Sequence, residues 1–103
     1  MTALVHMVMW KLNGATVQAR QVQAQVLVQA FEAIRGKVPG LLRMEVGVNL
    51  IEAADACDLG LCMVFESRQA LMDYNAHPEH LKIKDMLTPL RVARSQTDFE
   101  TAN

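Results

Sequence analysis

Several features that define large protein classes are scarce or missing in this sequence. There is no run of basic residues and the formal net charge is −1, which argues against nucleic acid as a partner. No apolar stretch reaches the roughly 20 residues that a membrane-spanning helix needs. No cationic segment precedes the apolar residues 1–10, as it would in a signal peptide. We therefore expect a cytoplasmic protein that binds neither nucleic acid nor membrane.

Cysteines and the usual cofactor-binding motifs are equally sparse. The two cysteines, Cys57 and Cys62, have no export signal before them, so we interpret them as free thiols and not as a disulfide or half of a zinc site. The sequence has no glycine-rich phosphate loop, no Gly-x-Ser-x-Gly elbow and no nucleotide fingerprint. If the protein is an enzyme, the sequence supports only catalysis without a cofactor.

Apolar residues, in contrast, are abundant. They make up 51% of the 103 residues, whereas charged residues make up 20%. The length fits a single domain, residues 1–103. Because a small monomer has a limited interior in which to bury this much apolar surface, the composition predicts a protein partner.

The hydrophobic pattern predicts strands and helices in an order typical of one fold. Thr16 and Ser67 are expected to cap helices, and Pro78 to end one short helix and open the next. The expected elements are a strand at 3–12, a helix from Thr16 to about Gly36, strands at 42–50 and 58–66, short helices after Ser67 and from Pro78 to Leu87, and a strand at about 92–99. This is the ferredoxin-like α+β fold, the split βαβ order β-α-β-β-α-β, with a four-stranded antiparallel sheet covered by helices on one face.

Two patterns predict which residues are buried. In the helix from Thr16, Val22 and Val26 are expected to widen a buried arc made by five other residues. These five are Ala24, Leu27, Ala30, Phe31 and Ile34. Alternate residues of the strand at 42–50 are expected to pack on the core, namely Leu42, Met44, Val46, Val48 and Leu50.

The sheet face without helices is predicted to be apolar at its centre and polar at its edges. The alternation of the central strands places six residues there, namely Val5, Met7, Met9, Gly60, Cys62 and Val64. The edge strands are expected to add Arg43, Glu45, Arg94, Gln96 and Asp98. Because an apolar centre with a polar rim is typical of protein interfaces, we expect a homodimer through the helix-free sheet face.

The segment Tyr74-Asn75-Ala76-His77-Pro78-Glu79-His80 concentrates the groups best suited to chemistry. It contains the only tyrosine and two of the three histidines. A phenol donates a hydrogen bond, and an imidazole takes or gives a proton near neutral pH, so this segment predicts an acid–base site. The alternative is a helix end at which polar side chains satisfy loose backbone groups.

The motifs of this chain follow the order found in one known family. His6 lies within His-Met-Val-Met-Trp-Lys, and Tyr-x-x-His-Pro-x-His at residues 74–80 is the most specific piece. The other segments are Pro39-Gly40, Glu45-Val46-Gly47-Val48-Asn49-Leu50, Asp58-Leu59, Phe65-Glu66-Ser67 with Ala70-Leu71, and Asp98-Phe99-Glu100. Over nearly its whole length the chain resembles the stress-responsive α/β-barrel domain family, often called Dabb, of the dimeric α+β barrel superfamily.

The resemblance implies a homodimer in which two four-stranded sheets close into a dimeric α/β barrel with the helices outside. Most members have no assigned reaction. One plant branch is a polyketide cyclase that performs an intramolecular aldol condensation in a pocket between sheet and helices. The residues that do this chemistry in the plant branch correspond to Tyr74 and His80, and its pocket-lining histidine on the first strand corresponds to His6.

Five residues thus form the predicted site, and most have a structural alternative. Tyr74 is expected to donate a hydrogen bond or proton to a carbonyl oxygen while His80 removes a proton from the adjacent carbon. His6, Trp10 and His77 are expected to line the pocket. Alternatively, His6 and Trp10 are core residues and His77 caps the following helix, and His80 has a structural role of its own.

Two functions remain open. The favoured one is a small dimeric, stress-associated domain with an apolar pocket for a small apolar or keto ligand, because many relatives in the resembled family have no known activity. The alternative is a cofactor-free, polyketide-cyclase-like enzyme or isomerase that uses Tyr74 and His80. A zinc or copper ion on the three histidines is disfavoured, because no carboxylate or cysteine falls into ligand spacing with them.

Overall fold

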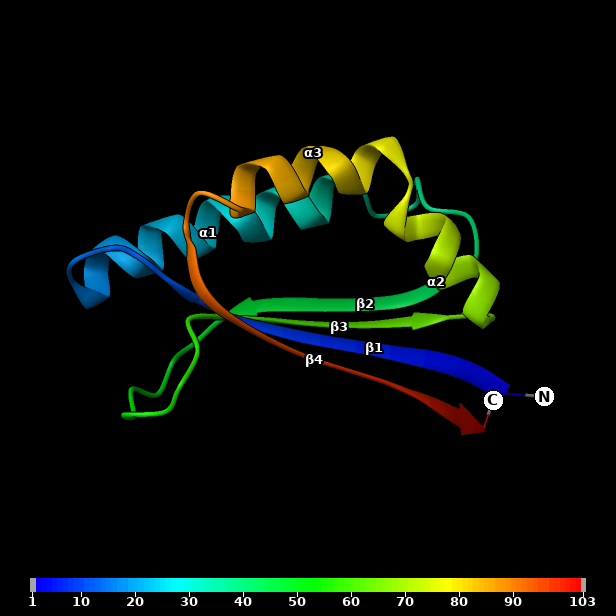
Figure 1. Cartoon of the computed structure of the whole chain (residues 1–103), viewed down its shortest axis with the longest axis horizontal. Coiled ribbons are helices and arrows are strands. Elements are labelled where there is room, and N and C mark those ends of the chain that lie inside the picture. Colours follow the sequence, from blue (N-terminus) through cyan, green and yellow to red (C-terminus); the bar gives the residue numbers. More distant parts are fainter. Residues whose placement is uncertain (1, 103) are drawn as a thin grey trace.

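The computed structural model describes residues 2–102 and contains seven strands and helices (Figure 1). They are β1 (Thr2–Leu12), α1 (Val17–Ala33), β2 (Leu41–Val48), β3 (Leu59–Phe65), α2 (Arg68–Asn75), α3 (Pro78–Leu87) and β4 (Arg91–Ala102). This is the predicted order, including the two short helices before the last strand. Residues 1 and 103 of the predicted domain lie outside the described residues.

The four strands form one antiparallel sheet in the order β2-β3-β1-β4. All three helices lie on the same side of it, here called the covered face (Figure 1). The opposite side, the open face, carries no helix of the described chain. The predicted ferredoxin-like α+β fold is therefore confirmed. Because side chains of a strand alternate between faces, β1 supplies one set of residues to each side of the sheet.

Two helices begin at the predicted capping residues. The Thr16 hydroxyl accepts a hydrogen bond from the backbone N–H of Ala19 at 3.0 Å. The Ser67 hydroxyl accepts one from the backbone N–H of Ala70 at 3.1 Å. Each bond satisfies an N–H that has no partner within the first turn of its helix.

The predicted Pro39-Gly40 turn leads into β2 and depends on its glycine. Gly40 has a φ of +80°, a conformation that side-chain-bearing residues rarely adopt. A Cβ at this position would also lie 2.6 Å from the Cβ of Ala70, at the start of α2. Gly40 therefore allows α2 to approach this turn closely.

The core lies between the covered face and the helices. Its large buried members include Leu4, Val8, Trp10, Leu27, Phe31, Ile34, Met44, Leu59, Met63, Phe65, Tyr74, Ile83 and Leu87. Val22 and Val26 are exposed at 61% and 49%, so the prediction that they widen the buried arc of α1 is wrong. The helix is fully buried only along the narrow stripe of Ala24, Leu27 and Phe31.

The predicted burial of the strand at 42–50 is wrong at both of its ends. A β-bulge shifts the pairing of β2 with β3 between Leu41 and Arg43, which makes Leu42 the extra residue. Leu42 is consequently exposed, and Leu41 packs against the core in its place. Leu50 lies beyond the end of β2 and is 90% exposed.

The centre of the open face has the predicted composition. Neighbouring residues of β1 and β3 pair there as Val5–Val64, Met7–Cys62 and Met9–Gly60. On β2, Arg43 and Glu45 pair with residues of the same face, as expected for the rim.

The predicted orientation of β4 is reversed. Opposite residues of antiparallel strands project to the same face, and β1 pairs with β4 as His6–Asp98, Val8–Gln96 and Trp10–Arg94. Arg94, Gln96 and Asp98 therefore lie on the covered face and not on the rim of the open face. Ser95, Thr97 and Phe99 take the open face instead. The error arises because residues 91–100 are all exposed, so the strand has no apolar alternation from which its orientation could be read.

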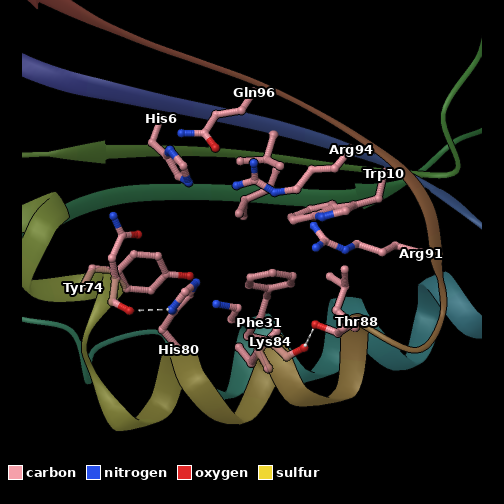
Figure 2. A pocket seen from close by; sticks show the side chains of 15 residues that line it. His6, Trp10, Phe31, Tyr74, His80, Lys84, Thr88, Arg91, Arg94 and Gln96 are labelled. Atoms are coloured by element: carbon pink, nitrogen blue, oxygen red, sulfur yellow. Dashed lines mark hydrogen bonds between the residues drawn. The ribbon is translucent and has the colours of Figure 1, made fainter.

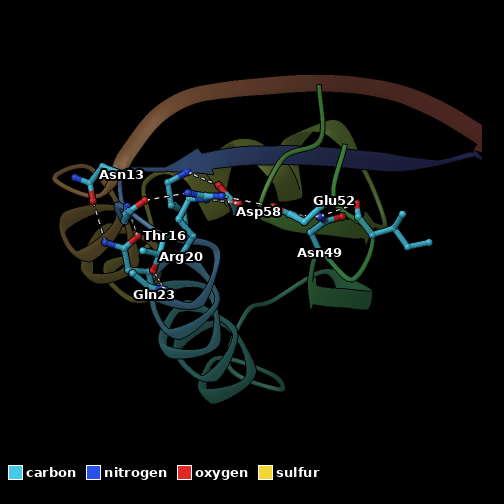
Figure 3. A network of polar contacts seen from close by, with 11 residues as sticks. Asn13, Thr16, Arg20, Gln23, Asn49, Glu52 and Asp58 are labelled. Atoms are coloured by element: carbon cyan, nitrogen blue, oxygen red, sulfur yellow. Dashed lines mark hydrogen bonds and ion pairs between the residues drawn. The ribbon is translucent and has the colours of Figure 1, made fainter. Parts of the chain in front are cut away.

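A polar network joins the start of α1 to the sheet (Figure 3). The Asp58 carboxylate accepts hydrogen bonds from the Leu12 backbone N–H at 2.8 Å and from Nε of Arg20 at 3.1 Å. Arg20 also donates to the Gly14 carbonyl at 3.1 Å and pairs with Glu52 at 3.5 Å. One guanidinium thus connects α1, the end of β1 and the connection between β2 and β3.

Two further observations concern the features that are scarce in the sequence. Cys57 and Cys62 are both free. Within residues 2–102, every helix is too short or too polar to cross a bilayer.

Candidate functional site

A cavity of about 370 Å³ lies between the covered face and the helices (Figure 2). Its apolar lining consists of Val8, Trp10, Phe31, Leu61, Ile83 and Leu87. Its polar lining consists of His6, Tyr74, Asn75, His80, Lys84, Thr88, Arg91, Arg94 and Gln96. Of the residues predicted to form a site, His6, Trp10, Tyr74 and His80 therefore face one space, although they come from β1, α2 and α3.

Tyr74 is positioned by the packing of its ring. It is only 2% exposed, and its ring centroid lies 5.4 Å from that of Phe65 and 4.5 Å from that of His80. Its hydroxyl points into the cavity towards His80 (Figure 2). Burial raises the pKa of Tyr74, so the phenol stays protonated near neutral pH and acts as a hydrogen-bond donor.

His80 is held by a bond across the break between α2 and α3. Its Nδ1 lies 3.1 Å from the carbonyl oxygen of Asn75, and since a carbonyl only accepts, Nδ1 must carry the proton. Nε2 of a neutral His80 then has a free lone pair. Burial lowers the pKa of His80, and the positive charges of Lys84, His6 and Arg94 lower it further, against the opposing effect of the Asn75 bond. The neutral, basic form of His80 is therefore favoured near neutral pH.

His6 forms a pair with a carboxylate that the sequence reading had placed on the other face. Nδ1 of His6 donates to Oδ1 of Asp98 at 2.6 Å, which leaves Nε2 as the second ring nitrogen for the cavity. Burial would raise the pKa of Asp98, but hydrogen bonds from Gln96 and His6 and the charges of His6 and Arg94 lower it overall. Asp98 thus orients the His6 ring. The two residues are opposite each other only because β1 pairs with β4 in this register.

Trp10 and Phe31 form an aromatic wall of the cavity. Their rings stack with centroids 5.8 Å apart and an interplanar angle of 30°. Figure 2 shows Trp10 next to Arg91 and Arg94, with the ring of Phe31 on the side towards His80. The cavity therefore has a proton-transfer end and an aromatic end.

His77 does not line this cavity, so its predicted place in the pocket is wrong. It is the N-cap of α3, and its ring Nδ1 accepts a hydrogen bond from the backbone N–H of Glu79 at 3.1 Å. The imidazole satisfies an N–H at the start of the helix, which is the structural alternative given above.

The sequence reading missed three cations that line the cavity: Lys84, Arg91 and Arg94. Lys84 lies one turn after His80 on α3, and this spacing is visible in the sequence. Arg94 was assigned to the wrong face of β4, and Arg91 lies just before the predicted start of that strand. Burial lowers the pKa of Arg94, and the charge of Arg91 lowers it further.

The described residues offer no obvious metal centre. Within residues 2–102, no group of three or more His, Cys, Asp or Glu side chains is arranged to hold a metal ion. A site that works without a cofactor remains a prediction.

Solved structures share this fold along almost the whole chain. A dimeric protein of unknown function with a ferredoxin-like fold, from Bacteroides fragilis, is 25% identical, with a TM-score of 0.84 and coverage of 96% of each chain. A Dabb family protein from Mesorhizobium loti is 19% identical, with a TM-score of 0.77 and coverage of 100% of each chain. The hydroxynitrile lyase of Passiflora edulis is 13% identical, with a TM-score of 0.78 and coverage of 97% of this chain and 94% of its own. No curated protein matches the chain significantly.

The family model of the stress responsive A/B barrel domain matches residues 4–101. The match includes all the residues that line the cavity and parts of all four strands. It confirms the resemblance that the motifs indicated. This chain belongs to the stress responsive A/B barrel domain family, Dabb.

Proposed function

We propose that this protein is a homodimeric domain whose cavity binds a small molecule. The supporting observation is that the Tyr74 hydroxyl and ring nitrogens of His6 and His80 face one space, which the apolar rings of Trp10 and Phe31 also line. The volume of about 370 Å³ falls in the usual range for small-ligand sites. Polar groups in such a site bind best to a ligand with a matching oxygen, and a carbonyl suits a phenol donor.

The proposed dimer forms through the open face. Met7, Met9 and Phe99 are exposed there at 38%, 47% and 46%. A broad hollow beside Met7 and Met9 extends along β2 and β3 to the 50–57 loop. A second copy of the chain would cover these exposed apolar side chains. The neighbour from Bacteroides fragilis is described as dimeric, which supports a dimer but does not identify its interface.

A second candidate function is proton transfer next to a carbonyl group, because of the way His80 is held. The Asn75 carbonyl fixes the proton of His80 on Nδ1, and so Nε2 is the base. Tyr74, protonated at neutral pH, is the matching donor for a carbonyl oxygen. General acid–base groups of this kind contribute about 10²–10⁴-fold to a rate.

The proposed step requires only groups of the chain and the substrate. Nε2 of His80 takes the proton from the carbon next to the carbonyl. The electron pair of that C–H bond becomes the carbon–carbon double bond of an enolate, and the negative oxygen accepts a hydrogen bond from Tyr74. His80 then returns the proton to the enolate oxygen, which gives the enol isomer. Alternatively, the enolate carbon attacks a second carbonyl, whose π electrons move to its oxygen, and this alkoxide takes the proton from His80 to give the aldol product.

Ligand binding is tested with a neutral aryl ketone, 2-acetonaphthone, added to isotopically labelled protein. We expect amide resonances around Tyr74 and Ile83 to shift, and those of the open face to stay unchanged. Tyr74→Phe should weaken binding several-fold because it removes the donor. The matched control is His77→Ala, a histidine of the same motif that lies outside the cavity. Shifts confined to the open face, or no shifts at all, would contradict the proposed site.

The catalytic candidate is tested by exchange of the α-protons of the same ketone in D2O. His80→Ala and Tyr74→Phe should each reduce protein-catalysed exchange by about 100-fold or more, whereas His77→Ala should retain it. If His80→Ala lowers the melting temperature but leaves exchange and ligand binding intact, His80 is structural and the catalytic candidate is wrong.

A further inference from the structure

The cavity contains positive charges without matching negative ones. Lys84, Arg91 and Arg94 line it, and no aspartate or glutamate of the described chain does. Lys84 comes from α3, and the two arginines come from β4 on the other side of the space (Figure 2). Two separate elements therefore present cations to one volume.

These three cations also lack the ion pairs that, within residues 2–102, five of the seven other lysines and arginines form. The paired ones are Arg20, Arg35, Arg43, Arg68 and Lys82, and none of them lines the cavity. For Lys84, Arg91 and Arg94, no ion pair occurs within residues 2–102. The carboxylate of Asp98 is already engaged by His6 and Gln96.

All three cations are exposed residues that also line the cavity, so an anion from solution can reach them. Partial burial lowers the pKa of Arg94 and the charge of Arg91 lowers it further, whereas the carboxylate of Asp98 opposes both effects. Lys84 lies in the last turn of α3, where a cation favours the helix dipole. That explanation does not extend to Arg91 and Arg94, which lie on a strand.

We infer that the ligand of this cavity is an organic acid: an apolar, preferably aromatic body with a carboxylate that Lys84, Arg91 and Arg94 bind. The inference rests on the proposed function and specifies its ligand class. The stacked rings of Trp10 and Phe31 offer a flat apolar surface to the body. Guanidinium groups bind a planar carboxylate with two parallel hydrogen bonds. The same cations would also bind a phosphate, so it is the aromatic wall that favours an organic acid over an inorganic anion.

The same charges connect the anion to the proton-transfer end of the cavity. Lys84 and Arg94 lower the pKa of His80. A carboxylate bound between them offsets part of their charge, so binding raises the pKa of His80. Binding of a carboxylate near Lys84 and Arg94 can therefore be detected as a rise in the pKa of His80.

The experiment compares two probes that differ only in charge, 2-naphthylacetate and 2-naphthylacetamide, by calorimetry and by NMR titration of His80. We expect the acid to bind at least about tenfold more tightly, since hydrogen bonds to charged groups are the stronger ones. Its affinity should fall as salt is raised. Only the acid should raise the pKa of His80.

Arg91→Gln combined with Arg94→Gln should remove the preference, so that the acid and the amide bind with equal affinity. Arg35→Gln and Lys82→Gln are the matched controls, since both residues are paired outside the cavity. Equal affinity for acid and amide in the native protein overturns the inference but leaves small-molecule binding intact. If neither naphthyl probe nor the neutral ketone perturbs the cavity, the proposed function itself fails. Equally tight binding of inorganic phosphate would overturn the role given to the apolar body.

Discussion

The two faces of the sheet are made by the same four strands and have different chemistry. On the covered face, β1 places His6 and Trp10 in a cavity where polar atoms have fixed orientations. On the open face, the intervening Met7 and Met9 have no directional groups and stay partly exposed. Because alternate residues of a strand point to opposite sides, adjacent positions can contribute to a ligand site and to a proposed subunit interface.

The largest expected effect is on the open face. Met7→Asp would place a charge at the centre of the proposed interface, where it has no partner, so we expect dissociation or unfolding. Sedimentation velocity at micromolar concentration measures the outcome. The control is Met72→Asp, because Met72 is exposed on α2 and away from both faces. A native Met7→Asp dimer would mean that the proposed interface is wrong.

Substitutions at two adjacent residues of β3 allow a direct comparison of the two faces. Met63 is fully buried on the covered face, so Met63→Ala should lower the free energy of unfolding by about 2–5 kcal/mol. Cys62→Ala, one residue earlier on the open face, should cost less and act mainly on the dimer dissociation constant. Denaturant unfolding followed at several protein concentrations separates the two effects. Equal losses with no dependence on concentration would argue against an interface at Cys62.

A smaller effect on stability is expected when the Asp98 carboxylate, which orients His6, loses its charge. Asp98→Asn keeps the shape of the side chain but removes the charge that His6 contacts at 2.6 Å. We expect a loss of about 1 kcal/mol of unfolding free energy, limited by the partial exposure of Asp98. Asp85→Asn, an exposed position on α3, is the matched control for removing a negative charge. A loss of the same size in both variants would assign no special role to the His6–Asp98 bond.

The smallest expected effect is the pH dependence of stability that His80 contributes. Its folded pKa lies below the ordinary value of 6.5, so the unfolded chain binds more protons just below that pH. The contribution of His80 is therefore present above 6.5 and is lost as the pH falls through 6.5 towards the folded pKa. Melting temperatures between about pH 5 and 8 should show a shallower slope for His80→Ala. Lys84→Gln should reduce the slope in part, and an unchanged slope in both variants would contradict the assignment.

Local sequence signals made much of the fold and part of the cavity lining predictable. The caps at Thr16 and Ser67 and the helix start at Pro78 depend on a few adjacent residues, and all three were predicted. The convergence of Trp10 and Tyr74 on one cavity followed from strand alternation and from the order of the elements.

The remaining part of the site depends on long-range pairing. His6 and Asp98 are 92 positions apart, and their contact exists because β4 pairs with β1 in one register. β4 is polar and exposed on both sides, so its sequence contains no pattern that assigns Arg94 or Asp98 to a face. The burial of Leu42 was predicted wrongly for a related reason. A β-bulge shifts the alternation of side chains between the two faces, and no residue type in this segment indicates the bulge.

The lack of a side chain at Gly40 affects where Tyr74 lies in the cavity. α2 has eight residues, and Tyr74 follows Ala70 by one turn, so the height at which the helix starts fixes the height of the hydroxyl. A methyl group on Gly40 would overlap Ala70 and lift that start away from the sheet. We expect the Tyr74 ring to move with the helix relative to His80. The absence of a side chain at Gly40 therefore sets how closely the start of α2, the helix that carries Tyr74, approaches this turn.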